Sequence, residues 1–393
     1  MSNKLNIILY GINELSIYLL QTLEKEKYNI IGFSDKENNA TTDGINGMKI
    51  IPIDQLENNP YDYIIICSDE TVDLKSIGNS ECKVINLSAQ LKEHLNIYNH
   101  LYYSNYDYNL LWANIEKAKT DPSCELFITG LSYAQRGIDE TLLQKKSVKL
   151  SSTSQDLYYD YVIAKDILSV PHNFKYCILG MAYFSFDCDL SLQSESWRIG
   201  QVYYPLYRDC HHYQLTENYS PPIGINKISD YIHYDHPVID QSLIIKCLID
   251  VFKIEFDRPL DENIWNSPCD HLPIEQLGIK RASQHCKHNY EQTKVEYKQI
   301  LKEYLDVLKE NKITPIVVIF PTTHYYYNYF DERVRNNYYR MMNELNCSYN
   351  FQFFDYFKCN LFTIDEFSDC DHLNKKGAQK MTELLNSVIC WSK

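Results

Sequence analysis

The sequence predicts an α/β protein with two three-layer domains, each a parallel sheet covered by helices on both faces. Three observations predict this class. The chain has 393 residues, more than one domain usually holds, and 45% of them are apolar. Short apolar runs alternate with amphipathic stretches, as in strands that helices cover on both sides. No apolar run approaches the ~18–20 residues that a bilayer span needs, so we expect a cytoplasmic protein without a membrane span.

Residues 1–90 are predicted to form a Rossmann-like first domain. An apolar run over residues 5–11 ends in Gly11, and an amphipathic stretch follows over residues 14–26. Four further runs lie at residues 29–35, 48–51, 61–66 and 83–86. Of the G-x-G-x-x-G pattern that cradles a dinucleotide only Gly11 is present, and Glu14 would bring a negative charge near the phosphates.

The first domain resembles the small Rossmann-like N-terminal domains of bacterial sugar-modifying enzymes, without their glycine-rich loop. Asp35, at the end of the second run, could bind a ribose but is also typical of a capping residue in a polar turn. We therefore expect no cofactor, and a domain that docks to a protein partner. A nucleotide-dependent enzyme, such as a sugar dehydrogenase, is the alternative.

Residues 91–120 are helical in pattern and contain neither Gly nor Pro, so they are predicted to form a helical connector. The alternation of strand and helix signals then restarts and defines a second domain over residues 121–393. Its strands are predicted at residues 124–130, 148–150, 176–180 and 316–320. Residues 193–289 are less regular, and we expect an irregular insertion there that could form a lid.

The composition argues against several classes of partner. The 38 basic and 52 acidic residues give a formal charge of −14, which disfavours nucleic acid and anionic lipid. The 13 cysteines are odd in number and scattered, so a disulfide framework is not expected. Residue types that bind zinc occur together at Cys210-His211-His212, Cys269-Asp270-His271 and His285-Cys286-Lys287-His288. No Cys-x-x-Cys pair is present, however, and we expect no metal.

Ser132 is a candidate nucleophile. It follows the predicted strand that ends at Gly130 and precedes a predicted helix. Its hydroxyl would project from the carboxyl edge of the sheet, where open α/β folds bind ligands, and nearby helix amides would favour a developing negative charge. The alternative is that Ser132 is an ordinary helix N-cap.

A second motif, Asp369-Cys-Asp-His372-Leu-Asn-Lys-Lys-Gly-Ala, precedes the last amphipathic helix. An aspartate three residues before a histidine can accept a hydrogen bond from one ring nitrogen, leaving the other to take a proton from a serine hydroxyl. The alternative is that the aspartates of this motif cap the helix and His372 fills space beside it.

Together, the strand-to-helix serine and the D-x-x-H-L-N-x-x-G-A motif resemble the SGNH (GDSL-like) hydrolase superfamily, over residues 122–393. The resemblance implies a flavodoxin-like second domain. It also implies that Ser132 is the nucleophile, His372 the base and Asp369 the residue that orients the base.

The family's oxyanion hole combines the serine amide with a glycine amide after the second strand and an asparagine side chain after the third. At the matching places this chain has Ser154 and Gln155, then Gly180 and Tyr183. These four residues are therefore the candidate oxyanion and substrate residues, although the family asparagine is missing.

The resemblance extends to the branch that handles acyl groups on bacterial polysaccharides and teichoic acids. It implies a serine-dependent O-acyl esterase or O-acyltransferase whose substrate is an acylated saccharide or glycan precursor. The alternative is a catalytically inactive SGNH-like scaffold or binding protein in polysaccharide biosynthesis, since the loss of one oxyanion donor costs about 10²–10³ in rate. The sequence leaves hydrolysis and transfer open.

Overall fold

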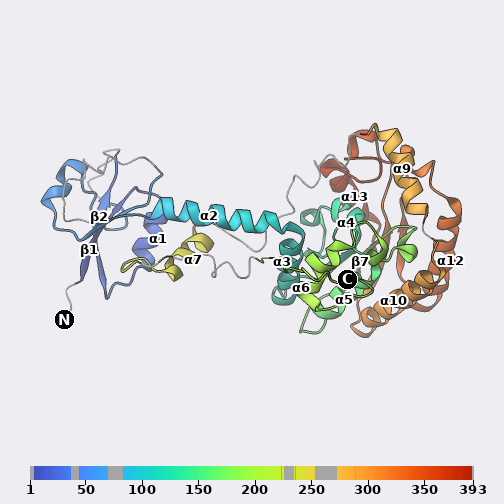
Figure 1. Ribbon diagram of the computed structural model, residues 1–393. Helices are drawn as coiled ribbons and strands as arrows, with labels where there is room; N and C mark the ends of the chain where they lie inside the picture. Colours follow the sequence, from blue (N-terminus) through green and yellow to red (C-terminus); the bar gives the residue numbers. More distant parts are fainter. Residues whose placement is uncertain are drawn as a thin grey trace. The chain divides into compact units, whose positions relative to one another are not determined.

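The computed structural model describes residues 4–36, 44–69, 83–222, 224, 234, 236–252, 272–287 and 289–391. The chain forms two compact units, one of Met1–Ser104 with Ile223–Glu255 and one of Asn105–Pro222 with Phe256–Lys393. Each unit contains a parallel sheet with helices packed against it (Figure 1). The predicted class, two α/β domains with parallel sheets, is therefore confirmed.

The first unit has a four-stranded sheet in the order β2-β1-β3-β4. Its elements are β1 (Leu5–Tyr10), α1 (Glu14–Thr22), β2 (Tyr28–Ser34), η1 (Ile53–Asn58), β3 (Tyr63–Ile66), β4 (Lys83–Asn86), α2 (Leu87–Ser104) and α7 (Gln241–Asp250). The central strands β1 and β3 are buried because the alternation of apolar runs and helices leaves neither face to water.

The carboxylate of Asp35 occupies the loop after β1. Gly11 has φ of +95°, and a Cβ there would lie 2.7 Å from the Cβ of Ser68, so the tight turn requires glycine. The amide of the next residue, Ile12, donates a hydrogen bond to Asp35 Oδ2 at 2.8 Å. A phosphate at this loop would have to displace that carboxylate.

The division of the chain differs from the predicted boundaries in two places. The expected connector is two helices, α2 in the first unit and α3 (Tyr106–Thr120) in the second. Part of the expected insertion at residues 193–289 returns to the first unit, where α7 packs against α2. Tyr18 donates a hydrogen bond to Asp250 Oδ2 at 2.5 Å, and Tyr28 to the carbonyl of Pro237 at 2.9 Å.

The second unit has a five-stranded sheet in the order β6-β5-β7-β8-β9. Counted from β5, this is the order 2-1-3-4-5 of flavodoxin-like sheets. The strands are β5 (Leu126–Gly130), β6 (Ser147–Lys149), β7 (Tyr176–Met181), β8 (Thr314–Ile319) and β9 (Gln352–Asp355). The first four were predicted; β9 was missed because its four residues are only half-buried and lack an apolar run.

The helices of this unit cover both faces of the sheet. The chain adds β6 on one side of β5 and then adds β7, β8 and β9 in turn on the other side. Because both crossovers are right-handed, α4 and α5 lie on opposite faces of the sheet. Helix α13 packs beside α4, and α10 packs beside α5 and α12. The bounds are α4 (Ser132–Gly137), α5 (Leu157–Ile167), α6 (Tyr204–Tyr207), α9 (Ile274–Lys287), α10 (Glu291–Glu310), α11 (His324–Tyr327), α12 (Glu332–Tyr349) and α13 (Lys375–Val388).

Short turns of helix complete the second unit: η3 (Glu140–Leu142), η4 (Ser185–Asp187), η5 (Leu190–Leu192), η6 (Ile199–Tyr203) and η8 (Ile364–Glu366). Helix α9 lies inside the expected irregular insertion and is regular, whereas residues 225–233 and 253–271 of that stretch lie outside the described residues. Among the described residues, no helix combines the length and the apolar character needed to cross a bilayer.

Candidate active site

The site begins where β5 ends. Gly130 has φ of +124°, and a Cβ there would lie 2.1 Å from the carbonyl oxygen of Gly180. Only glycine allows the chain to turn this sharply. The turn starts α4 directly after the strand and makes Ser132 its first residue. Asp160 accepts a hydrogen bond from the Gly130 amide at 2.8 Å and holds the turn from the side of α5.

Ser132, His372 and Asp369 lie in hydrogen-bonding order. Ser132 Oγ is 2.8 Å from His372 Nε2, and the other ring nitrogen, Nδ1, is 3.0 Å from Asp369 Oδ2. Asp369 Oδ1 also accepts hydrogen bonds from the backbone amides of Asp371 and His372, at 2.9 and 2.8 Å. These bonds hold its carboxylate against the imidazole ring. The structure thus brings together the three residues that the sequence singled out for chemistry.

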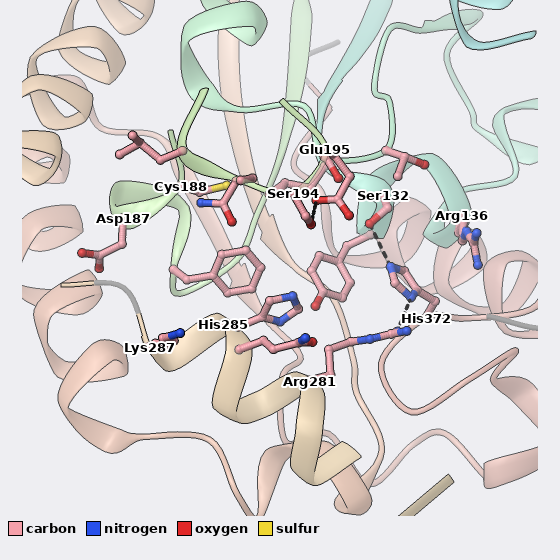
Figure 2. A pocket seen from close by; sticks show the side chains of 18 residues that line it. Ser132, Arg136, Asp187, Cys188, Ser194, Glu195, Arg281, His285, Lys287 and His372 are labelled. Atoms are coloured by element: carbon pink, nitrogen blue, oxygen red, sulfur yellow. Dashed lines mark hydrogen bonds between the residues drawn. The ribbon is translucent and has the colours of Figure 1, made fainter. Parts of the chain in front are cut away.

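A second carboxylate and an arginine join this group. Asp371 is fully buried, and its Oδ1 is 3.4 Å from His372 Nδ1. Arg281, from α9, donates hydrogen bonds to Asp369 Oδ2 at 3.0 Å and to Asp371 Oδ1. In Figure 2, His372 lies between Ser132 and Arg281. Arg281 could not be identified from the sequence, because nothing in the local pattern of α9 indicates which residues its side chains contact.

The charges around His372 favour its protonated form. Burial by itself lowers the pKa of His372, but the carboxylates of Asp369 and Asp371 outweigh this effect and raise the pKa to about 9. Burial has the opposite effect on a carboxyl group and raises the pKa of Asp369. The neighbouring His372 and then Arg281 outweigh burial and bring the pKa of Asp369 well below its ordinary range. The ring therefore holds a proton at neutral pH in the free protein.

Tyr133 fixes the plane of the imidazole. Its ring is stacked on that of His372 with the centroids 4.9 Å apart, and its hydroxyl donates a hydrogen bond to Asp371 Oδ2 at 2.7 Å. Burial, and then the charge of Asp371, raise the pKa of Tyr133 well above its ordinary value. Tyr133 therefore stays a neutral donor. In the sequence, its place directly after Ser132 sets it apart from the chain's many other tyrosines.

A cavity of about 590 Å³ opens in front of Ser132. This volume is within the usual range of small-molecule pockets, about 300–1,000 Å³. Its lining is mixed in charge, with Arg136 and Lys287 on one hand and Asp187 and Glu195 on the other (Figure 2). The charged side chains of both signs offer hydrogen-bond partners to a hydroxyl-rich ligand.

Residues 274–386 match the DltD protein family. The matched range contains Arg281, Asp369 and His372 but not Ser132. The match relates this part of the chain to an SGNH-like, acyl-modifying family. Residues 3–85 match a family described as C2185-like, N-terminal.

No curated protein matches the chain. A solved structure described as a platelet activating factor from Streptococcus pneumonia is 9% identical, covering 75% of this chain and 98% of its own, with a TM-score of 0.37. A likeness at that level bears on neither the fold nor the function of this chain.

Of the four predicted oxyanion and substrate residues, Ser154 lines the cavity. Its backbone has φ of 57°, a left-handed conformation that is uncommon for a serine. Gln155, the next residue, is buried and does not line the cavity. Its Nε2 donates hydrogen bonds to the carbonyl of Leu150 at 2.9 Å and to Asp160 at 2.7 Å, and its Oε1 accepts from Tyr203 at 3.2 Å.

Gly180 and Tyr183 also lie away from the cavity. Gly180 is inside β7, where a Cβ would lie 2.3 Å from the Cβ of Ala134, so the glycine allows α4 to pack closely on the sheet. Tyr183 is buried beside Phe357 and donates a hydrogen bond to Asp355 Oδ2 at 2.6 Å. Both expectations from the sequence therefore need correction, because Gly180 lies within β7 and the Tyr183 side chain is buried in the core.

The site also has a donor set that can hold a cation. Ligand atoms of Asp369, Asp371 and His372 all lie within 4.8 Å of one another. The guanidinium of Arg281 already donates to both carboxylates and supplies the positive charge that a metal ion would bring. The arrangement therefore fits a hydrogen-bonded acid–base group better than a metal centre.

Proposed function

We propose that the protein is a serine-dependent O-acyl esterase or O-acyltransferase acting on a glycan or glycan precursor. The observation that carries the proposal is the 2.8 Å contact between Ser132 and His372 at a cavity beside the carboxyl edge of the sheet. The DltD family, which matches part of this unit, is involved in the D-alanylation of teichoic acids. An acylated saccharide is therefore the substrate class that we propose.

In the proposed mechanism, Ser132 Oγ attacks the ester carbonyl while His372 Nε2 takes the hydroxyl proton. Asp369 keeps the ring oriented and stabilises the imidazolium that forms. We assign the oxyanion to the backbone amides of Ser132 and Ser154, which flank the cavity. His372 then returns the proton to the leaving alcohol, and water or an acceptor hydroxyl releases the acyl group from Ser132.

The neutral form of His372 is the form that can accept the serine proton. Since its pKa is raised to about 9, only a minor fraction of the free protein is competent at neutral pH. Activity should therefore increase with pH up to about 9.

The test is turnover of p-nitrophenyl acetate together with covalent labelling by a fluorophosphonate. Wild-type protein should be active and labelled at Ser132, whereas Ser132→Ala should be neither, and His372→Ala should be labelled far more slowly. Ser169→Ala, at an exposed serine outside the cavity, is the matched control and should behave as wild type. Equal activity in all four proteins would remove the case for serine chemistry.

A second candidate function is a catalytically silent domain that binds a saccharide. It is favoured by the placement of Gln155 and Tyr183, whose side chains are engaged in the core and therefore do not serve as oxyanion donors. Binding of an acetylated oligosaccharide by wild-type protein, without turnover and without labelling of Ser132, would favour this function. In either case we propose that the first unit serves as a docking domain for a protein partner.

A further inference from the structure

The buried carboxylate of Asp160 joins two segments that border the active-site cavity. Its Oδ1 accepts a hydrogen bond from the Gly130 amide at 2.8 Å and another from Gln155 Nε2 at 2.7 Å. Gly130 ends β5, two residues before Ser132. Gln155 directly follows Ser154 in the loop between β6 and α5. One oxygen atom therefore holds both segments that carry the proposed oxyanion donors.

The backbone amides of Ser132 and Ser154 are available to a ligand. Ser132 is the first residue of α4, and Ser154 lies in a loop, so neither amide has an acceptor within a helix or strand. Within the described part of the chain, neither amide donates a hydrogen bond to another residue. Both residues line the cavity. Amides without an acceptor at a cavity are the groups that an oxyanion hole needs.

The loop that carries Ser154 needs to be held in place. The left-handed backbone of Ser154, with φ of 57°, persists only where the surroundings over-determine it. A hydrogen bond from the Ser152 amide to the Gly130 carbonyl, at 3.2 Å, joins the loop to the end of β5. The shorter bond from Gln155 to Asp160 restrains the loop at the residue next to Ser154.

Asp160 is itself fixed. It lies in the first turn of α5, where its amide donates a hydrogen bond to the Asp156 carbonyl at 3.0 Å. The residue is 2% exposed, so water does not compete for Oδ1. Burial raises the pKa of Asp160 well above its ordinary value. The two hydrogen bonds need only an oxygen acceptor, which a neutral carboxyl group also offers.

We propose that Asp160 is a positioning residue that sets the oxyanion hole by directing the Ser132 and Ser154 amides into the cavity. The inference rests on the proposed acyl chemistry of Ser132. As Ser132 Oγ bonds to the ester carbon and loses its proton to His372, the carbonyl π pair moves to the oxygen, where the two amides donate to it. The pair returns when the alcohol leaves with the proton. Asp160 contacts no reacting atom and acts by keeping both donors in place.

The experiment measures p-nitrophenyl acetate turnover by variants of the full chain, with kcat divided by the fraction of protein that a fluorophosphonate labels at completion. Asp160→Ala should lower kcat by about 10²–10³, as the loss of an oxyanion donor does, and change KM by less than about twofold. Asp160→Asn keeps a side-chain oxygen and should retain most of the activity. Asp166→Ala, farther along α5 and outside the cavity, is the matched control and should behave as wild type.

Inhibition by 1,1,1-trifluoroacetone separates positioning from a loss of stability. Its carbonyl carbon can take up Ser132 Oγ to form a hemiketal oxyanion, which resembles the tetrahedral intermediate. Asp160→Ala should raise the inhibition constant by about the factor by which it lowers kcat. A protein that is only less stable should bind the inhibitor unchanged per labelled site. Gln155→Met, which removes only the bond nearest Ser154, should change both quantities in the same direction by a smaller factor.

Three outcomes with an active wild type that is labelled at Ser132 would overturn this inference alone. They are an unchanged kcat in Asp160→Ala, a lower kcat without a parallel rise in the inhibition constant, and an Asp160→Asn protein as impaired as Asp160→Ala. If Asp160→Ala does not fold, wild-type values of both quantities in Gln155→Met would overturn it. A wild type that is neither active nor labelled would refute the proposed function, and the positioning role with it.

Discussion

Replacing Arg281 by methionine should shift the pH dependence of catalysis upward. Arg281 Nη1 lies 3.5 Å from His372 Nδ1, and its positive charge opposes the proton on the ring. Coulomb's law with an effective dielectric constant of ~20 gives about 5 kcal/mol at that distance. The guanidinium charge is delocalised and its side chain is 16% exposed, so we expect about half of this or less. That corresponds to a rise of about 1–2 units in the pKa of His372.

The assay is the pH profile of kcat/KM for p-nitrophenyl acetate, which reports the ionisation of the base in the free enzyme. Wild-type activity should increase about tenfold per pH unit and level off near the pKa of His372, about 9. The profile of Arg281→Met should lie at higher pH, so that its activity at neutral pH is about 10- to 100-fold lower. Arg281→Lys keeps the charge and should shift the profile less.

Lys287→Met is the matched control, since Lys287 is another cation that lines the cavity. It should leave the apparent pKa in place. An Arg281→Met protein that is folded by circular dichroism, yet has an unchanged or lower apparent pKa, would refute the electrostatic reasoning.

Three further predictions follow from the site and its support. Asp369→Asn should reduce kcat by about 10³–10⁴, and Asp371→Asn only by about tenfold, because Asp369 is the nearer carboxylate to His372 Nδ1; kcat for the two variants checks this. Stability should decrease as the pH rises from about 6.5 to 9, because folding raises the pKa of His372 and the protonated ring stabilises the fold below that window. Over this pH range the free energy of unfolding in urea should fall by up to ~3 kcal/mol in the wild type but not in His372→Gln. A difference between the two proteins that does not change with pH would contradict this prediction. Lys149→Met should destabilise the protein by about 1–3 kcal/mol in the same assay, since buried Lys149 donates to two carbonyls at the end of α4; an unchanged unfolding midpoint would contradict this.

Much of the second unit could be predicted from local patterns. Apolar runs indicated β5 and β7 because strands buried on both faces need a continuous apolar sequence. Gly130 and Ser132 marked the strand-to-helix turn, and the spacing of Asp369 and His372 placed carboxylate and imidazole within one turn. Each of these features depends on neighbours in the sequence, which is why it could be seen there.

Other features depend on contacts that the sequence does not encode locally. Gln155 was predicted to face the cavity, but its side-chain amide is buried and makes hydrogen bonds with Asp160 and Tyr203. A buried amide needs such partners, and they lie in the core. The return of α7 to the first unit left no composition signal, because its apolar face looks the same whichever unit it packs against. Arg281 likewise sits on an ordinary amphipathic helix.

By itself, then, the sequence determined the α/β class, the turn that carries Ser132 and the order of carboxylate and imidazole near His372. Only the tertiary structure decided that Arg281 supplies the positive charge beside the two aspartates, and that Asp160 joins Gly130 to Gln155. The reason is physical. Periodicity and turn chemistry act over a few residues, whereas a charge or a lone pair finds its partner through space, after the helices have packed.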